Sequence, residues 1–155
     1  MSGKGGGEGD RFAHAQATGY LLARAHGLVR ARMSAALEGG PLHLGHVLIL
    51  STLIARNDLT QAQLTQMAGI EKSSVVLFID ALEKDGWVER QPHPTDRRAH
   101  RVHLTREGRA RFREVGKKLA AAEREALAAL RATEQRTLQE LLLKLIEDSG
   151  NEARK

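Results

Sequence analysis

One segment of the chain, Gln61 to Asp80, constrains the fold more than any other. Two helices that cross steeply through a tight turn need apolar residues where they touch and a glycine in the turn. Gly69 stands where the turn is expected. The five positions of helix contact all carry apolar residues, which are Leu64, Ala68, Ile70, Val75 and Phe78. A single match would be common by chance, but the whole set is not, so the segment predicts a helix-turn-helix.

The residues that follow this segment predict a two-stranded hairpin with a basic loop. Trp87 to Gln91 and Ala99 to Leu104 have the length and composition of short strands. The connecting loop, Pro92 to Arg98, is too long for a tight turn and contains two prolines, so we expect a stiff, projecting wing. The second strand alternates, with Arg101 and His103 expected to face outward and Val102 and Leu104 inward.

Four helices are expected before the hairpin. The break at Gly39-Gly40-Pro41 ends the first, and the second is apolar nearly all round, as a helix enclosed by others should be. Thr60 and Gln63 form a capping box for the third, which stops at Gly69. The four expected ranges are Phe12 to Leu37, Leu42 to Arg56, Thr60 to Ala68 and Lys72 to Lys84.

Two helices are expected after the hairpin, and their apolar faces need a partner. Thr105 is expected to cap a long fifth helix and Thr133 a sixth. The economical partner for the first helix and the last two is the same set from a second copy, so we expect a homodimer. The alternative is that these helices cover only their own domain. The sixth helix carries a stripe too apolar for a solvated terminal helix, formed by Leu138, Leu141, Leu142, Leu145 and Ile146.

The expected fold class is mainly α with a small β-hairpin wing. Aromatic residues make up only 3% of the chain while Ala, Leu and Arg are abundant, which favours helix over sheet. The expected parts are a disordered N-terminal tail (residues 1–10), a first helix for dimerisation (11–41), a winged helix-turn-helix lobe (42–104), C-terminal helices for dimerisation (105–148) and a frayed tail (149–155).

The charge distribution points to an anionic partner. The chain has a net charge of +5 and a pI near 10.0, which alone is a weak hint. Between Glu89 and Arg113, however, eight arginines stand against three acids. One short segment, which includes the wing, therefore carries as much net positive charge as the whole chain.

Several classes of function are excluded or disfavoured. The absence of cysteine excludes disulfides, thiol switches and thiolate metal sites. No apolar run is long enough to span a membrane and no signal peptide is apparent, so we expect a cytoplasmic location. The only glycine-rich run lies in residues 1–10, and no nucleophile stands with a base in a recognisable setting. We therefore expect no enzyme activity and no cofactor.

From about Tyr20 to Ile146 the chain resembles the MarR family, the multiple antibiotic resistance regulators. The specific part is Leu59 to Arg109, where a helix ending L-E-K-x-G, the wing triplet D-R-R and a following L-T-x-x-G stand in the family's order. The resemblance implies a homodimer whose fourth helices enter successive major grooves of a near-palindromic operator in double-stranded DNA, while the wings reach the minor grooves. It also implies repression that a small ligand relieves.

Carried over by position, the resemblance assigns DNA contacts to the fourth helix and the wing. Asp96 is expected to brace the wing, and Arg97 or Arg98 to enter the minor groove, because a guanidinium is always charged and its flat fork fits a narrow groove. The alternative for each arginine is a solvated surface charge, which we expect for Arg109, Arg111 and Arg113. The remaining assigned residues are Lys72, Ser73, Ser74, Val76 and Leu77 on the helix, with His100 and Arg101 on the strand.

The fourth helix departs from the family pattern at its outer face. Many members carry arginine where this chain has Leu77 and Ala81, so the bidentate contact from arginine to guanine is missing there. Two interpretations stay open: Val76 and Leu77 contact thymine methyl groups, or they form an exposed apolar patch without that role. A winged helix that binds another protein through this patch is the rival class, and the arginine wing argues against it.

Family ligands often bind near the first two helices, and many are aromatic acids, while some members respond to acyl-CoA thioesters. An acidic ligand held by His and Arg fits this region, and so does a metal, because histidines at i and i+3 share a helix face. The metal ranks lower, since no acid is adjacent to the histidine pair. For each residue alone, an ordinary helix-end or surface role is the simpler interpretation. The candidate effector residues are Tyr20, Arg24, His26, Arg30, His43 and His46.

Overall fold

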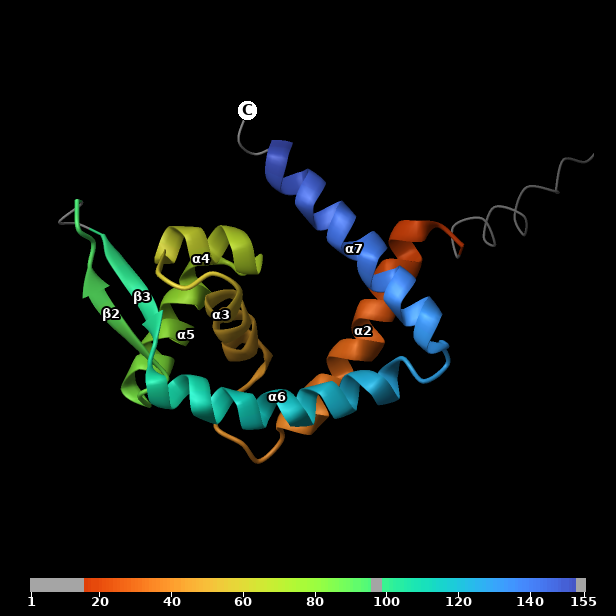
Figure 1. The fold of residues 1–155 in the computed structure, drawn as a ribbon, viewed down its shortest axis with the longest axis horizontal. Coiled ribbons are helices and arrows are strands. Elements are labelled where there is room, and N and C mark those ends of the chain that lie inside the picture. Colours follow the sequence, from red (N-terminus) through yellow and green to blue (C-terminus); the bar gives the residue numbers. More distant parts are fainter. Residues whose placement is uncertain (1–15, 96–98, 153–155) are drawn as a thin grey trace, which may run out of the picture. The chain divides into compact units, whose positions relative to one another are not determined.

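The computed structural model describes residues 16–95 and 99–152, with side chains described as far as residue 147 (Figure 1). The chain is mainly helical with a small antiparallel sheet, which confirms the predicted fold class. The elements are α2 (Thr18–Leu37), α3 (Leu44–Ala55), β1 (Leu59–Thr60), α4 (Gln61–Ala68), α5 (Lys72–Lys84), β2 (Val88–Pro92), β3 (His100–Leu104), α6 (Arg106–Ala126) and α7 (Ala132–Glu152). Within the described residues, no helix is long and apolar enough to cross a membrane.

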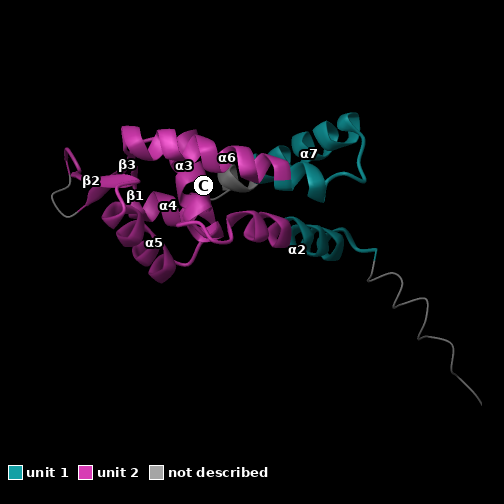
Figure 2. Cartoon of the chain, turned by 90° about the horizontal axis from the view of Figure 1, so that it is seen from below, with its two compact units in different colours: residues 1–29, 122–155 teal, residues 30–121 magenta. Residues whose placement is uncertain are grey.

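The chain divides into two compact units (Figure 2). One comprises residues 30–121 and contains α3, α4, α5 and the sheet. The other comprises residues up to 29 and from 122 onward, and contains α7. The boundaries fall inside α2 and α6, so each of these helices contributes residues to both units.

The core of the 30–121 unit lies between α3, α5 and the sheet. Leu64 and Val75, two of the predicted contact positions of the helix-turn-helix, are fully buried, and the other three are partly buried. Gly69 ends α4 with φ +63°, a left-handed conformation that glycine adopts at little cost. The largest fully enclosed side chains are Ile49, Leu50, Leu53, Leu64, Ile79, Leu82 and Trp87.

The sheet has the strand order β1-β3-β2, with both pairs antiparallel. Val88 pairs with Leu104, and Leu59 pairs with Val102. Val102 and Leu104 are buried while Arg101 and His103 are partly exposed, which confirms the predicted alternation. The strand β1 was not expected, because two residues are too few to show an alternating pattern.

Several predicted helix boundaries are wrong by a few residues. Gln16 and Ala17 are not helical, so α2 begins at Thr18, while Phe12 to Ala15 lie outside the described residues, as does the predicted tail 1–10. The helix α3 begins at Leu44 because His43 caps it. We expected other helices to cover α3 on all sides, and within this single chain they do not, since Leu48 and Ile54 are 47% and 44% exposed.

The start and end of α7 differ from the prediction as well. Thr133 lies inside its first turn rather than at the cap, because Glu134 accepts a hydrogen bond from the backbone N–H of Arg131 at 2.7 Å. The helix also continues through residues 149–152, which were expected to be frayed. One glycine in a helix costs about 1 kcal/mol, which is too little to end a helix by itself. Residues 153–155 lie outside the described residues.

Candidate functional site

The N-terminal half of α5 presents the residues that the sequence assigned to it. Lys72 and Ser73 are exposed and Ser74 is partly exposed, while Val76 and Leu77 are 38% and 67% exposed. Glu71 precedes the helix and makes no side-chain capping bond to it. The first backbone N–H groups of α5 therefore have no side-chain cap, and such groups, at the positive end of a helix dipole, attract anions such as phosphate.

A fork of three charged residues joins α5 to β2, and it was not predicted. The two ends of the Arg90 guanidinium pair with Asp80 and Glu83, and the backbone N–H of Arg90 donates to Glu83 Oε1 at 2.9 Å. Partial burial lowers the pKa of Arg90, but its hydrogen bonds to Asp80 and Glu83 outweigh this effect and raise that pKa overall. The spacing of two acids three residues apart on α5 is the sequence signal that was available.

The wing residues Asp96, Arg97 and Arg98 lie outside the described residues, so their roles stay predictions. The base of the wing is described: the N–H of His93 donates to the carbonyl of Ala99 at 3.1 Å. His100, the first residue of β3, is exposed, and its contact with DNA stays a prediction.

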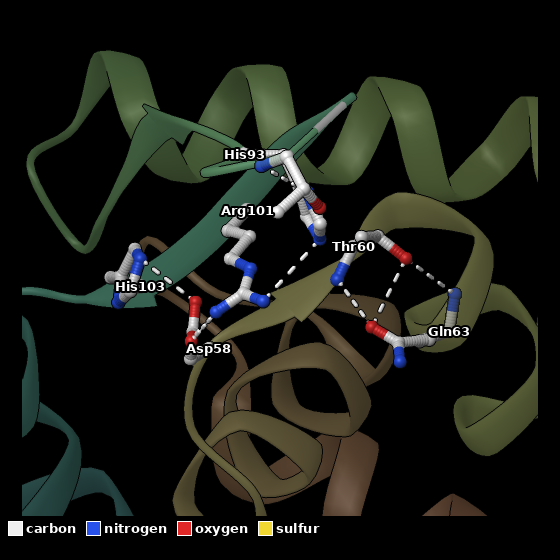
Figure 3. A network of polar contacts seen from close by, with 7 residues as sticks. Asp58, Thr60, Gln63, His93, Arg101 and His103 are labelled. Carbon is white, nitrogen blue, oxygen red and sulfur yellow. Dashed lines mark hydrogen bonds and ion pairs between the residues drawn. The ribbon is translucent and has the colours of Figure 1, made fainter. Parts of the chain in front are cut away.

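Arg101 belongs to a polar network that joins β3, the base of the wing and the residue before β1 (Figure 3). Its guanidinium pairs with Asp58, and its Nη2 lies 3.3 Å from Nε2 of His93. His103 Nε2 lies 3.2 Å from Asp58 Oδ1 on the same carboxylate. Asp58 has φ +69°, an unusual conformation for a non-glycine residue, and its two partners hold it between α3 and β1. Arg101 is therefore engaged inside the chain, a feature that sequence spacing did not reveal.

The histidine pair at the start of α3 forms a capping box. Nδ1 of His43 accepts a hydrogen bond from the N–H of Gly45 at 3.1 Å, and Nδ1 of His46 accepts from the N–H of His43 at 3.4 Å. The two rings are in contact, tilted by 30° with centroids 3.8 Å apart. Burial, and next the neighbouring His43, lower the pKa of His46 to about 4. His46 is therefore neutral at pH 7, as an accepting nitrogen requires.

A small pocket lies where α2 ends and α3 begins, within the 30–121 unit. Its volume is about 190 Å³. Among the predicted effector residues, His43 lines it, and Arg30 lies one helical turn before its wall on α2. Tyr20, Arg24 and His26 are exposed residues of the other unit, and His46 is buried behind His43. The residues that line the pocket are Ser34, Leu37, Glu38, Leu42, His43 and Leu44.

The alternative of a metal site finds no geometric support in the described part of the chain. No group of three or more His, Asp or Glu side chains there is arranged to hold a metal ion. The capping box also uses Nδ1 of both His43 and His46 as acceptors, which leaves one nitrogen of each ring for any other partner.

Large apolar side chains remain exposed on α2 and α7. Leu142 is 37% exposed, and its neighbours on α7 are more so, while Leu138 is partly covered. This exposure leaves the predicted stripe available to a second surface. The exposed members on the two helices are Leu21, Leu22, Leu28, Leu141, Leu142, Leu143, Leu145 and Ile146.

Comparison with known proteins agrees with this arrangement. The family model of the MarR family matches residues 42–100. The Mycobacterium tuberculosis MarR family protein Rv2887 in complex with salicylic acid is 31% identical, with a TM-score of 0.67 over 83% of this chain and 97% of that one. Its complex with p-aminosalicylic acid gives 30% identity and a TM-score of 0.70 over the same shares. Bordetella bronchiseptica BpsR, whose DNA binding is regulated by 6-hydroxynicotinic acid, shares the fold at 22% identity, with a TM-score of 0.73 over 84% of this chain and 94% of that one.

Proposed function

Because the chain belongs to the MarR family of transcriptional regulators, we propose that it represses transcription as a homodimer on a near-palindromic operator and is released by a small aromatic acid. The observation that carries the DNA-binding part is the outer face of α5. That face combines exposed Lys72 and Ser73 with a helix N-terminus that has no side-chain cap. These groups suit phosphate contact, which positions a helix in the major groove without specifying sequence.

Sequence readout then falls to the remaining assigned residues. Val76 and Leu77 are exposed enough to contact thymine methyl groups. Arg97 or Arg98 would enter the minor groove, helped by His100, and Asp96 would brace the wing. Arg101 would support this wing from its base through Asp58 rather than reach DNA itself, since its guanidinium already has an intramolecular partner.

The homodimer is supported by the exposed apolar side chains of α2 and α7. Exposed leucines on two terminal helices are costly in water, and a symmetric partner presents the same helices in return. Two copies of the lobe would also match the two half-sites of a near-palindromic operator.

The effector proposal rests on the pocket at the junction of α2 and α3. Leu37, Leu42 and Leu44 supply apolar walls, and Ser34, Glu38 and His43 supply polar groups. A volume of about 190 Å³ suits a single-ring acid and is below the range of about 300 to 1,000 Å³ for larger ligands. A CoA thioester would therefore extend outside it. The salicylic acid bound to Rv2887 is a single-ring acid of this class.

The test is a titration of the purified chain with a double-stranded site that it selects from a random pool. Affinity should fall as salt rises, because phosphate contacts release counterions. Saturating salicylate should then lower the affinity at fixed salt, and calorimetry should detect salicylate binding to the free protein. An affinity for DNA that salt does not change would instead favour the rival class, a protein-binding module that uses the Val76–Leu77 patch.

A further inference from the structure

Three aromatic rings connect the pocket wall to the recognition helix α5. We propose that the ring pair His43–His46 couples occupancy of the pocket to the position of α5 through Phe78, which makes Phe78 a positioning residue for DNA recognition. The proposal rests on the proposed function, since it concerns how the effector pocket acts on the DNA-binding surface. All the residues involved belong to the 30–121 unit.

The first step is that the pocket wall moves with the histidine pair. His43 lines the pocket, so a ligand that fills the pocket contacts its side chain. The capping box ties the His43 backbone to the His46 ring, and the His43 ring to the backbone of α3. The tilted rings, with centroids 3.8 Å apart, are also in direct contact. A displacement of His43 is therefore shared with His46.

The second step is that both histidines touch one ring of α5. The Phe78 ring meets His43 edge-on with centroids 4.7 Å apart, and meets His46 in the same manner at 5.4 Å. Phe78 is also pressed against the backbone of α3: a β-carbon added at Gly45 would lie 2.6 Å from Phe78 Cζ. With histidines on one side and no spare room at Gly45, the ring has little freedom to absorb a shift of its neighbours.

The third step is that Phe78 belongs to the helix that faces DNA. Val76 and Leu77 precede it directly and are exposed, while Val75 and Ile79 on the inner face are fully buried. A shift that pushes Phe78 therefore displaces the exposed half of α5 relative to the core. Misplacement of a recognition helix by a fraction of a turn changes which base edges its side chains reach.

Phe78 was predicted only as a helix contact of the helix-turn-helix, and a packing role alone gives a different result on mutation. Loss of packing lowers stability and basal DNA affinity. Loss of coupling lowers the response to the effector while basal affinity and effector binding persist, because coupling is the free energy that links the two sites.

The experiment uses His46→Gln and Phe78→Leu in the full chain, with Phe112→Leu as the matched control. Glutamine at position 46 can still accept the capping hydrogen bond, as in an ordinary capping box, but has no ring. Phe112 is a buried phenylalanine of the same unit, outside the ring contacts of the histidine pair. Fluorescence of Trp87, the single tryptophan, reports folding of each variant. His46→Gln carries the test alone if Phe78→Leu does not fold.

Each protein is titrated with the selected DNA site with and without saturating salicylate, and its salicylate affinity is measured by calorimetry. We expect salicylate to weaken DNA binding about tenfold in the wild type and in Phe112→Leu, within the usual range of coupling. In His46→Gln and Phe78→Leu the weakening should shrink to about twofold or less while salicylate still binds. A response of wild-type size in His46→Gln overturns the proposal.

A second arm separates failure of the coupling from failure of the proposed effector. If salicylate leaves wild-type DNA affinity unchanged, the proposed effector class is wrong, and the coupling is then tested by filling the pocket with Ser34→Trp. Ser34 is an exposed pocket residue, so the added ring can occupy the pocket without entering the core. The coupling requires Ser34→Trp to weaken DNA binding in the wild type and not in His46→Gln. An equal effect in both backgrounds, or none in either, overturns it.

Discussion

At the scale of single residues, the environment of a side chain decides its role more than its type does. His43 and His46 were candidates for an anion or metal site, yet their Nδ1 atoms accept backbone hydrogen bonds that begin α3. Their spacing of three residues, which suggested a shared ligand, is also the spacing of a capping box. The environment also decides the role of Arg101, because its guanidinium forms an ion pair with Asp58 of the same chain.

The lowered pKa of His46 predicts a pH-dependent stability. The folded value of about 4 lies below the ordinary 6.5, so between these pH values the unfolded chain takes up a proton at this ring and the folded chain does not. The contribution is fully present above pH 6.5 and is lost as pH falls towards 4. Urea unfolding should show that the wild type loses about 2 to 3 kcal/mol more than His46→Gln between pH 7 and 4.5. Equal losses in both proteins would contradict a neutral, buried His46.

The wing arginines give a second prediction at this scale. Replacing Arg97 and Arg98 together by alanine should weaken DNA binding about tenfold or more at fixed salt and leave the dimer intact. The slope of log affinity against log salt should also fall in magnitude by about 1 for each phosphate that the variant no longer neutralises. Arg109→Ala with Arg113→Ala removes the same charge from α6 and serves as the control. If gel-shift titrations give both double variants the same DNA affinity and the same salt dependence, the wing arginines are solvated surface charges and do not contact DNA.

At the scale of elements, the sequence predicts the helices and the hairpin but misses what joins them. The apolar spacing of α5 and the alternation of β3 are local patterns, and both were confirmed. The strand β1 depends on pairing with β3, more than forty residues later in sequence, and the Arg90 fork depends on the approach of β2 to α5. Contacts of this kind follow from tertiary structure, so no local pattern predicts them.

The Arg90 fork predicts that a residue outside the DNA-binding surface affects DNA affinity. Arg90→Gln leaves the Asp80 and Glu83 carboxylates unpaired on α5, where they repel phosphate, so DNA affinity should fall about fivefold to tenfold. The pairs are partly exposed, so stability should fall by only about 1 kcal/mol. Adding Asp80→Asn and Glu83→Gln to this variant should restore DNA affinity in the same gel-shift titration. Failure of that restoration would show that Arg90 acts through geometry rather than charge.

At the scale of the whole molecule, the packing of a single chain buries the core of the 30–121 unit but leaves apolar side chains of α2 and α7 exposed. The 30–121 unit encloses its own core, with Ile49, Leu50 and Val75 fully buried. The candidate site follows the same division: the α5 face was predictable from motif order, whereas the pocket, the histidine cap and the ring contacts with Phe78 required the folded lobe. The stripe of leucines on α7 was predicted from the sequence, and the proposed homodimer would bury it against a second copy of the chain.

The dimer proposal is tested by placing a charge within that stripe. Leu142 belongs to the predicted stripe and is 37% exposed, so part of its side chain is open to a partner. Leu142→Asp would bury an unpaired carboxylate there, which is costly enough to separate the subunits at micromolar concentration. Lys144→Asp, at an exposed position on the same helix, changes charge without entering the stripe and should remain dimeric. Sedimentation velocity measures the association of both variants.

The monomeric Leu142→Asp should keep its Trp87 fluorescence, because the 30–121 unit has its own core. Its affinity for an operator with two half-sites should fall far more than its affinity for a single half-site. A Leu142→Asp protein that sediments as a dimer as stable as the wild type would show that this stripe faces its own chain.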